Sequence, residues 1–261
     1  KSISILRLTA ILLCSMHLLG SASLQAQMNK WVNYSPDLTT VLKNPAMGWM
    51  MYEEGWSFQG TRHNKSNIYT PEVFWKQMEE CKAADYSNIL YIRMLWKDLE
   101  PEEGKYAWIY NERYKWYIQK AKDKGLKLAF RVFFHGVDGV PSYVYEAGAT
   151  ESPIDDEGKT QPYYDNPVFL EKLDKFIEAF AKEYDNPDEV DYIDAYGLGR
   201  WGEGHGLVLE KQDNLESVIR QITESYARHF KKVLTEMNLS QSDYRFSKPL
   251  VYDKLGFLPR R

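Results

Sequence analysis

The side chains best suited to chemistry lie in the run 196–206, which reads YGLGRWGEGHG. Glu203 stands between two glycines, with Trp201 two residues before it and His205 two residues after it. Glycine lets the backbone approach a ligand closely, and a carboxyl group beside a tryptophan in a cleft can have a raised pKa that suits general acid catalysis. The run therefore makes Glu203 a candidate catalytic acid. The alternative is a structural carboxylate that pairs with Arg93 or Arg200.

Candidate substrate-binding side chains flank Glu203 or lie where two strand-like runs end. Arg93 could keep a carboxylate ionised, Trp96 could stack on a flat sugar ring, and His135 could hydrogen-bond a hydroxyl group. The alternatives are ordinary packing for Trp96 and a capped loop histidine for His135. The full set of candidates is Arg93, Trp96, His135, Trp201 and His205.

These residues need a scaffold, and apolar runs alternate along the chain with amphipathic helical patterns. Two helices have clear start signals, because Thr70-Pro71 and Asn166-Pro167 each place a capping side chain before a proline. A third helix is expected to start at Asp213 and Glu216, which have capping-box spacing. The strand-like runs are 47–52, 89–94, 126–134, 190–198 and 249–252, and the helical patterns span 74–81, 114–121, 169–184 and 215–233.

Apolar strands that alternate with helices predict a parallel sheet. Such a sheet can be open and doubly wound, or it can close into a barrel. Long segments rich in Trp, Gly and charged residues follow the second, third and fourth strands, whereas the connections from helix to strand are short. This distribution favours a (β/α)8 TIM barrel, whose sites lie at the C-terminal ends of the strands. The barrel is expected to be incomplete here, with about the first five βα units.

The doubly wound alternative rests on a glycine pattern. Residues 197–202 match G-x-G-x-x-G directly after a strand, which is the phosphate-binding pattern of dinucleotide folds. However, the pattern follows the fourth strand rather than the first, and the bulky Trp201 stands where a helix should open. The next helical pattern begins only near Asp213. Nucleotide binding is therefore not expected.

The first 26 residues have the features of a secretory signal peptide. Lys1 and Arg7 are followed by the apolar run 8–19 and then by small and polar residues. The apolar run is shorter than the roughly 20 residues that a membrane span needs. The expected organisation is a signal peptide over 1–26 and the N-terminal part of a barrel over 27–261. The protein is expected to be secreted or periplasmic, with no membrane attachment after cleavage.

Composition bears on the class of partner. A net charge of -4 and a pI near 5.8 provide no basic surface for nucleic acid. Trp, Tyr and Phe make up 15% of the chain, which predicts an aromatic groove for a flat ligand such as a sugar. Cys81 lies on an apolar stripe with Phe74 and Met78, so we expect an inert core thiol. The histidines show no metal-binding spacing, and no metal or other cofactor is expected.

Four motifs resemble known proteins. R-x-x-W at 93–96, followed by L-E-P-x-x-G-x-Y at 99–106, resembles the second-strand signature of clan A glycoside hydrolases, particularly the beta-galactosidase-like family 42 barrels. N-P-x-x-G-W at 44–49 and W-G-E-G-H at 201–205 resemble a group of secreted, poorly characterised proteins with a clan-A-like barrel. The resemblance spans about residues 44–252.

The resemblance implies a retaining mechanism, in which one carboxyl group is the nucleophile and another acts as acid and then as base. Glu203 corresponds to the acid/base after the fourth strand, and Arg93 corresponds to the arginine that ends the second strand. The nucleophile is expected near a seventh strand, outside this sequence. One position departs from the pattern, because Gly202 stands where clan A enzymes usually carry asparagine.

The expected function is therefore the hydrolysis of O-glycosidic bonds in a poly- or oligosaccharide by a secreted enzyme. Two alternatives remain open. A non-catalytic carbohydrate-binding barrel would keep the aromatic residues and lack the second carboxylate. A metal-dependent barrel hydrolase would need a ligand cluster that the spacing of the histidines does not provide.

Overall fold

The computed structural model describes residues 35, 37, 39–40, 48–53, 56–57, 60–61, 70–134, 139–153, 160–204 and 206–236. The chain divides into two compact units, Lys1–Val41 and Leu42–Arg261. In the first unit, the Asp37 carboxylate accepts hydrogen bonds from the backbone amides of Thr39 and Thr40, which forms a local turn. The expected signal peptide lies outside the described residues.

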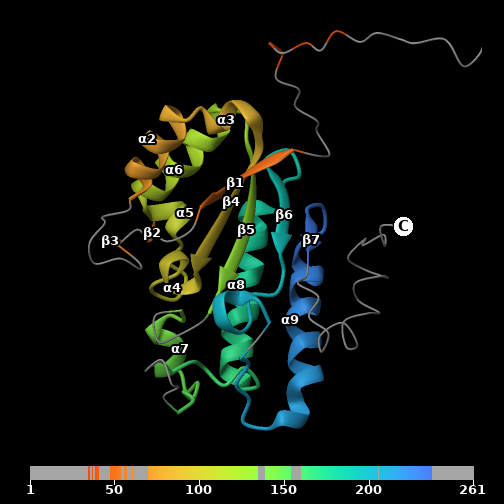
Figure 1. The fold of residues 1–261 in the computed structure, drawn as a ribbon. Helices are drawn as coiled ribbons and strands as arrows, with labels where there is room; N and C mark the ends of the chain where they lie inside the picture. The colour runs from red at the N-terminus through yellow and green to blue at the C-terminus, as the bar shows by residue number, and fades with distance from the viewer. Residues whose placement is uncertain are drawn as a thin grey trace, which may run out of the picture. The chain divides into compact units, whose positions relative to one another are not determined.

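The main sheet belongs to the second unit, and its five described strands are all parallel (Figure 1). A separate antiparallel pair is formed by β2 (Trp56–Ser57) and β3 (Gly60–Thr61). The strands of the main sheet, from one edge to the other, are β1 (Trp49–Glu53), β4 (Ser87–Leu95), β5 (Lys127–Phe133), β6 (Val190–Asp194) and β7 (Leu234–Glu236).

The order of these strands decides between the two predicted architectures. In a doubly wound sheet the order reverses at a switch point, and helices cover both faces. Here each strand lies beside the strand of the sheet that precedes it in the sequence. The buried side chains of the helices form a single core cluster with one face of the sheet. The described residues therefore form an α/β fold of the incomplete (β/α) barrel type, as predicted. The doubly wound alternative is excluded.

The helices connect the strands, and the two predicted start signals are confirmed. The side chains of Thr70 and Asn166 accept hydrogen bonds from backbone amides of the first turn of α2 and α8. Asn111 caps α6 in the same way. The helical segments are α2 (Pro71–Glu80), α3 (Ala83–Tyr86), α4 (Trp96–Leu99), α5 (Ala107–Tyr110), α6 (Glu112–Asp123), α7 (Ser142–Glu146), α8 (Pro167–Tyr184), η1 (Arg200–Gly202), η2 (Gln212–Asn214) and α9 (Leu215–His229).

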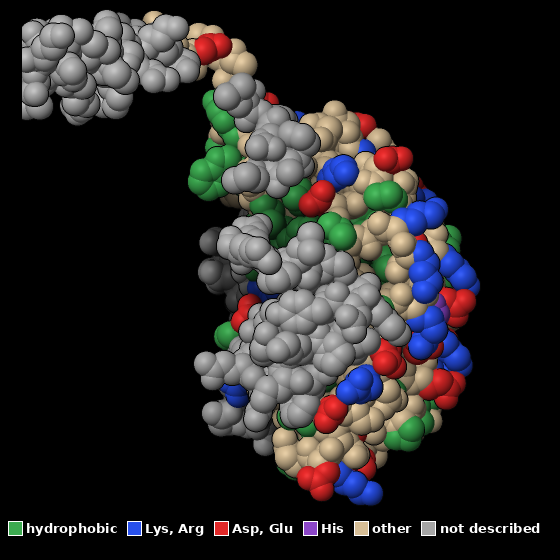
Figure 2. Space-filling model, turned by 90° about the vertical axis from the view of Figure 1, so that its right-hand side faces the viewer, with side chains coloured by type: hydrophobic (Ala, Val, Ile, Leu, Met, Phe, Trp, Pro, Cys, Tyr) green, Lys and Arg blue, Asp and Glu red, His purple; other side chains and the backbone are tan. Residues whose placement is uncertain are grey.

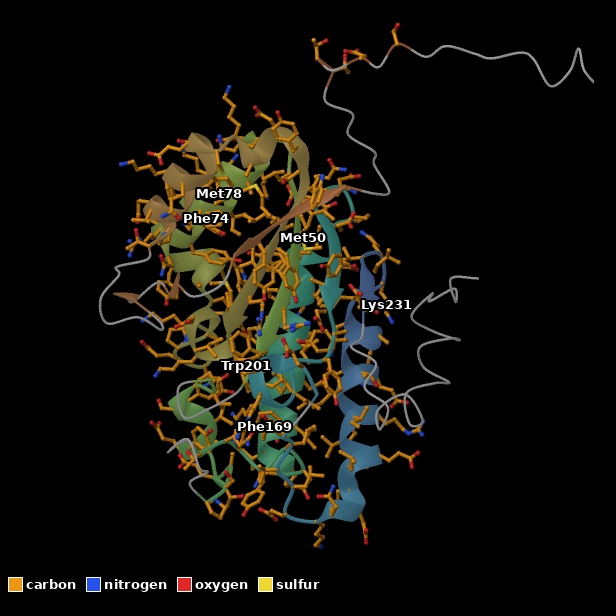
Figure 3. The ribbon with its side chains drawn as sticks, viewed as in Figure 1. Met50, Phe74, Met78, Phe169, Trp201 and Lys231 are labelled. Carbon is orange, nitrogen blue, oxygen red and sulfur yellow. The ribbon has the colours of Figure 1, made fainter. Side chains whose placement is uncertain are left out.

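The core lies between the sheet and these helices. Strand residues at alternate positions, such as Ile92 of β4 and Phe130 of β5, share the core cluster with Phe74 of α2 and Phe169 of α8 (Figure 3). The Trp96 ring lies 6.1 Å from the Phe169 ring, and the largest fully buried side chains are aromatic. Most of the aromatic surplus therefore packs the core, and the prediction that it signals a groove is wrong for these rings.

The end of the described sheet differs from the prediction. The fifth strand is Leu234–Glu236, and the run 249–252, which was predicted for this place, lies outside the described residues. The helix before it ends at His229 rather than at 233. It ends there because the backbone amides of residues 231–233 donate to the carboxylate of Asp185, which follows α8.

Two smaller predictions are also wrong. Cys81 is not a core thiol, because α2 ends at Glu80 and the Cys81 side chain is exposed. The capping box does not form, because Asp213 lies in η2 and the N-cap of α9 is Asn214, which makes no side-chain cap. The Asn214 amide donates instead to Asp165.

Charged side chains of both signs are intermixed on the described surface seen in Figure 2. Exposed ion pairs generally contribute little to stability. Asp174 of α8 differs, because one of its oxygens contacts three side chains of α9: it accepts hydrogen bonds from Ser225 and Arg228 and lies 3.2 Å from His229 Nε2. Partial burial opposes the charge of Asp174, but these partners outweigh it and lower the pKa.

The substitution Asp174→Asn should therefore destabilise the fold in a pH-dependent way. The folded-state pKa lies below the unfolded value of about 3.9, so the carboxylate stabilises the fold above that value and ceases to do so as the pH falls through the folded pKa. We expect the Tm to fall by about 2–4 °C near neutral pH and by less in acid, measured by circular dichroism. The control Glu171→Gln breaks an exposed pair with Lys175 and should change the Tm by less than about 1 °C. Equal effects of the two variants at neutral pH would contradict the prediction.

Candidate functional site

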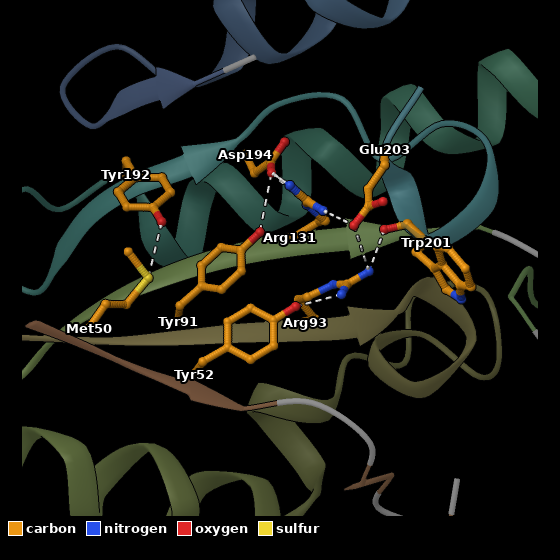
Figure 4. Close-up of polar contacts among 9 residues, drawn as sticks. All are labelled: Met50, Tyr52, Tyr91, Arg93, Arg131, Tyr192, Asp194, Trp201 and Glu203. Atoms are coloured by element: carbon orange, nitrogen blue, oxygen red, sulfur yellow. Dashed lines mark hydrogen bonds and ion pairs between the residues drawn. The ribbon is translucent and has the colours of Figure 1, made fainter. Parts of the chain in front are cut away.

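The face of the sheet opposite the helices carries tyrosine and charged side chains (Figure 4). Strand register arranges them in two rows, one made of Tyr52, Tyr91 and Tyr192 and the other of Arg93, Arg131 and Asp194. Neighbouring tyrosine rings lie 5.4 and 6.0 Å apart. The charged row lies nearer the C-terminal ends of the strands, which is the end where barrels build their sites.

Glu203 lies over the charged row and is held there by two ion pairs. Its Oε1 atom is 3.6 Å from Arg131 Nη1 and 3.9 Å from Arg93 Nη2, and its side chain is 37% exposed. Both distances exceed the roughly 2.7–2.9 Å of a charge-assisted hydrogen bond. The pairing with Arg93 that the structural alternative requires is therefore present, and the carboxylate remains partly exposed.

Arg131 is fixed from its other side by Asp194. Arg131 Nε donates to Asp194 Oδ2 at 2.5 Å, Nη2 contacts the same oxygen, and the Tyr91 hydroxyl donates to it at 3.2 Å. Burial raises the pKa of Asp194, and Arg131 and Tyr91 oppose this shift. Burial likewise opposes the charge of Arg131, but Asp194 outweighs it, so the pKa of Arg131 lies above its ordinary value. Asp194 is thus committed to Arg131, whereas Glu203 is the accessible carboxylate of the cluster.

The loop that carries Glu203 packs directly on the end of β5. Its glycines at 197, 199, 202 and 204 all have positive φ, a conformation that glycine adopts without steric cost. A β-carbon at Gly197 would lie 2.2 Å from the Val132 carbonyl oxygen. One at Gly202 would lie 2.9 Å from the Phe133 β-carbon. These two glycines let the loop approach the sheet, so the G-x-G-x-x-G pattern has a packing explanation.

The two candidate tryptophans differ in their surroundings. Trp201 lies beyond the C-terminal ends of β4 and β5 (Figure 3), and its side chain is 47% exposed. Trp96 is fully buried, and its indole N–H donates to Glu100 Oε2 at 2.8 Å. The prediction that Trp96 stacks on a sugar is therefore wrong, because the α4 turn that begins at Trp96 places this ring in the core. His135 and His205 lie outside the described residues.

Five residues of this face were not singled out from the sequence, namely Tyr52, Tyr91, Arg131, Tyr192 and Asp194. A usable signal was nevertheless present. Each of the central strands is largely apolar and carries a charged residue at a position that faces away from the core, Arg93 in β4, Arg131 in β5 and Asp194 in β6. A charge inside a buried parallel strand needs a partner, so such positions predict a polar cluster on the opposite face.

Two further properties hold for the described part of the chain. It contains no group of three or more His, Cys, Asp or Glu side chains placed to hold a metal ion. Nor does any helix in it have the length and apolar character needed to cross a membrane.

Solved structures similar to this chain include three glycosidases. A beta-glucosidase from Exiguobacterium marinum is 15% identical, with a TM-score of 0.40 over 61% of this chain and 33% of that chain. Endo-glycoceramidase II from Rhodococcus sp. is 15% identical, with a TM-score of 0.42 over 65% of this chain and 44% of that chain. Xylanase B from Clostridium stercorarium F9 is 18% identical, with a TM-score of 0.41 over 72% of this chain and 56% of that chain. The matched regions are therefore a third to just over a half of those proteins.

No protein-family model and no curated protein matches the sequence. These three neighbours are 15–18% identical to this chain. The resemblance to the family 42 barrels has no support from them.

The close approach of the loop to the sheet predicts a large difference between two glycine substitutions. Gly197 and Gly125 have nearly the same φ, 68° and 69°, but a β-carbon at Gly125 would meet nothing within 4 Å. We expect Gly125→Ala to lower the Tm by about 2–4 °C through backbone strain alone. Gly197→Ala adds the clash with the Val132 carbonyl and should lower the Tm by more than about 8 °C or prevent folding. Similar melting temperatures for the two variants would show that the loop is not packed as described.

Proposed function

We propose that this chain belongs to a secreted retaining glycoside hydrolase that cleaves O-glycosidic bonds of a poly- or oligosaccharide. The observation that carries the proposal is the position of Glu203, a partly exposed carboxylate at the C-terminal ends of the strands, between the guanidinium groups of Arg93 and Arg131. Catalytic groups of (β/α) barrels lie at this end. The resemblance to clan A assigns the acid/base to the same residue.

In this proposal Glu203 donates a proton to the leaving oxygen and then accepts a proton from the attacking water. A retaining enzyme also needs a nucleophilic carboxylate about 5–5.5 Å from the acid/base. Asp194 is unsuited to that role, because it is 5% exposed and bound to Arg131. We therefore assign the nucleophile to a later strand of the barrel, as the clan A resemblance implies.

Exposed aromatic rings on either side of Arg93 support a carbohydrate ligand. The side chains of Trp201 and Tyr52 are 47% and 48% exposed, and flat rings of this kind stack on the apolar faces of sugars. We propose Trp201 as a stacking platform, with His135 and His205 as partners for sugar hydroxyls. Beta-galactosides are the first substrates to test, because of the motif at 93–106. Secretion, proposed from residues 1–26, would place the enzyme among extracellular or periplasmic glycans.

Two observations favour a second candidate, a carbohydrate-binding barrel without catalysis. Glu203 contacts two arginines, and Gly202 replaces the asparagine that clan A enzymes usually carry. In such a protein Glu203 would hold the two guanidinium groups in place and transfer no proton.

The substitution Glu203→Gln in the complete protein separates the two candidates. If Glu203 is the acid/base, kcat should fall by about 10²–10⁴-fold while substrate binding is nearly unchanged. The measurement is hydrolysis of aryl beta-galactosides, aryl beta-glucosides and a panel of polysaccharides, with Glu102→Gln as an exposed control. Near-normal turnover by Glu203→Gln would contradict the assignment. Glycan binding without hydrolysis by the unaltered protein would favour the second candidate.

Trp201 is exposed and Trp96 is buried, so we expect their replacement by alanine to have opposite effects on sugar binding and on stability. Trp201→Ala should weaken sugar binding by about 10-fold and change the Tm little, because the ring is exposed and stacks on the ligand. Trp96→Ala removes a fully buried ring and should lower the Tm by about 10 °C. Calorimetric titration with the hydrolysed glycan and thermal melting measure the two effects. If Trp201→Ala binds the glycan as tightly as the unaltered protein does, Trp201 is not the platform.

A further inference from the structure

Trp201 has an unusual backbone conformation. Its φ and ψ are 54° and 15°, in the left-handed region, and among the described residues only Lys82 shares a positive φ without being glycine. A β-carbon disfavours this region, and residues that stay in it are held by their surroundings.

Arg93 makes a hydrogen bond to this residue: its Nη2 donates to the Trp201 carbonyl oxygen at 2.7 Å (Figure 4). The following residue, Gly202, is packed against Phe133, and its amide donates to the Gly199 carbonyl at 3.1 Å. The loop is therefore fixed on both sides of the Trp201 carbonyl.

Arg93 is itself immobilised. It is 4% exposed, its Nη1 donates to the Tyr52 hydroxyl at 2.5 Å, and its guanidinium carbon lies 5.4 Å from the centre of the Phe133 ring. The planar guanidinium group has donors in a fixed fork, so one side chain can reach Tyr52 and the Trp201 carbonyl together. An apolar side chain can make neither contact, and a lysine lacks the rigid fork of donors.

We propose that Arg93 is a positioning residue that holds Trp201 in its left-handed conformation and so presents the exposed indole beside Glu203. This role differs from the one predicted from the sequence, which is to keep a carboxylate ionised. The inference rests on the proposed function only in treating the indole as a ligand contact. The restraint on the backbone is independent of it.

A double-mutant cycle on stability tests the restraint. Glycine adopts the left-handed region without strain, so in the Trp201→Gly variant residue 201 needs no restraint from Arg93. We expect Arg93→Met to lower the Tm by about 2–4 °C more in the chain that keeps Trp201 than in the Trp201→Gly variant. If Arg93 were only a buried packing residue, the loss would be the same in both backgrounds, and that result would overturn the proposal. If Arg93→Met does not fold, Arg93→Lys takes its place in the cycle.

Amide hydrogen exchange provides a second readout. If Arg93 had only a general structural role, its loss would not raise the exchange of this loop in particular. Arg93→Met should raise the exchange of the Gly202 and Glu203 amides by about 10-fold or more relative to core amides of β5. The matched control is Tyr52→Phe, which removes the hydroxyl partner of Arg93 and leaves its contacts with the Trp201 carbonyl and Glu203, so these amides should keep their protection. Unchanged exchange in Arg93→Met, or equal loss in Tyr52→Phe, would overturn the proposal. Both readouts are free of substrate, so an inactive or non-catalytic protein can still satisfy them.

Discussion

The charged row lies on the face of the sheet opposite the helices, and its charges have to be paired with partners on that face. Arg93 and Arg131 stand side by side in neighbouring strands, and both are largely buried. A buried charge without a partner is costly, so each guanidinium group needs acceptors nearby. Asp194 provides them from β6, and the loop after β6 provides Glu203 and the Trp201 carbonyl. The position of that loop is therefore a consequence of two arginines in the sheet.

The same strands specify the core and the site, because successive side chains point to opposite faces. In β5, Phe130 and Val132 belong to the core cluster, whereas Arg131 and Phe133 face the candidate site. A shift of register by one residue would place charged groups in the core and apolar groups in the site. The packing of the helices thus determines which face of the sheet carries the arginines. The sheet that forms the core is also the scaffold of the site.

The sequence predicts the elements with strong local signals and misses those that depend on distant contacts. Four of the five strands and the starts of α2 and α8 follow from apolar runs and from capping residues before proline. The short fifth strand does not, because Leu234–Glu236 contains no apolar run. The end of α9 does not either, because it depends on hydrogen bonds from the backbone amides of residues 231–233 to Asp185, more than 40 positions earlier.

The residues of the candidate site likewise divide into those with a local sequence signal and those that depend on distant contacts. Glu203 and Trp201 were found from their local glycine pattern. The pairing of Arg131 with Asp194 joins residues 63 positions apart and has no local spacing. Trp96 was misassigned because a residue directly after a strand can enter either the site or the core, and the α4 turn decides between them.

The side-by-side arginines also bear on how the nascent chain folds. Parallel register pairs Arg93 with Arg131, so β4 and β5 bring two like charges together when they associate. Like charges opposite each other destabilise a strand pair. Synthesis proceeds from the N-terminus, and Asp194 leaves the ribosome only after both strands have emerged. The β4–β5 pair therefore gains the acceptor for Arg131 only when β6 arrives, so we expect the three central strands to assemble together.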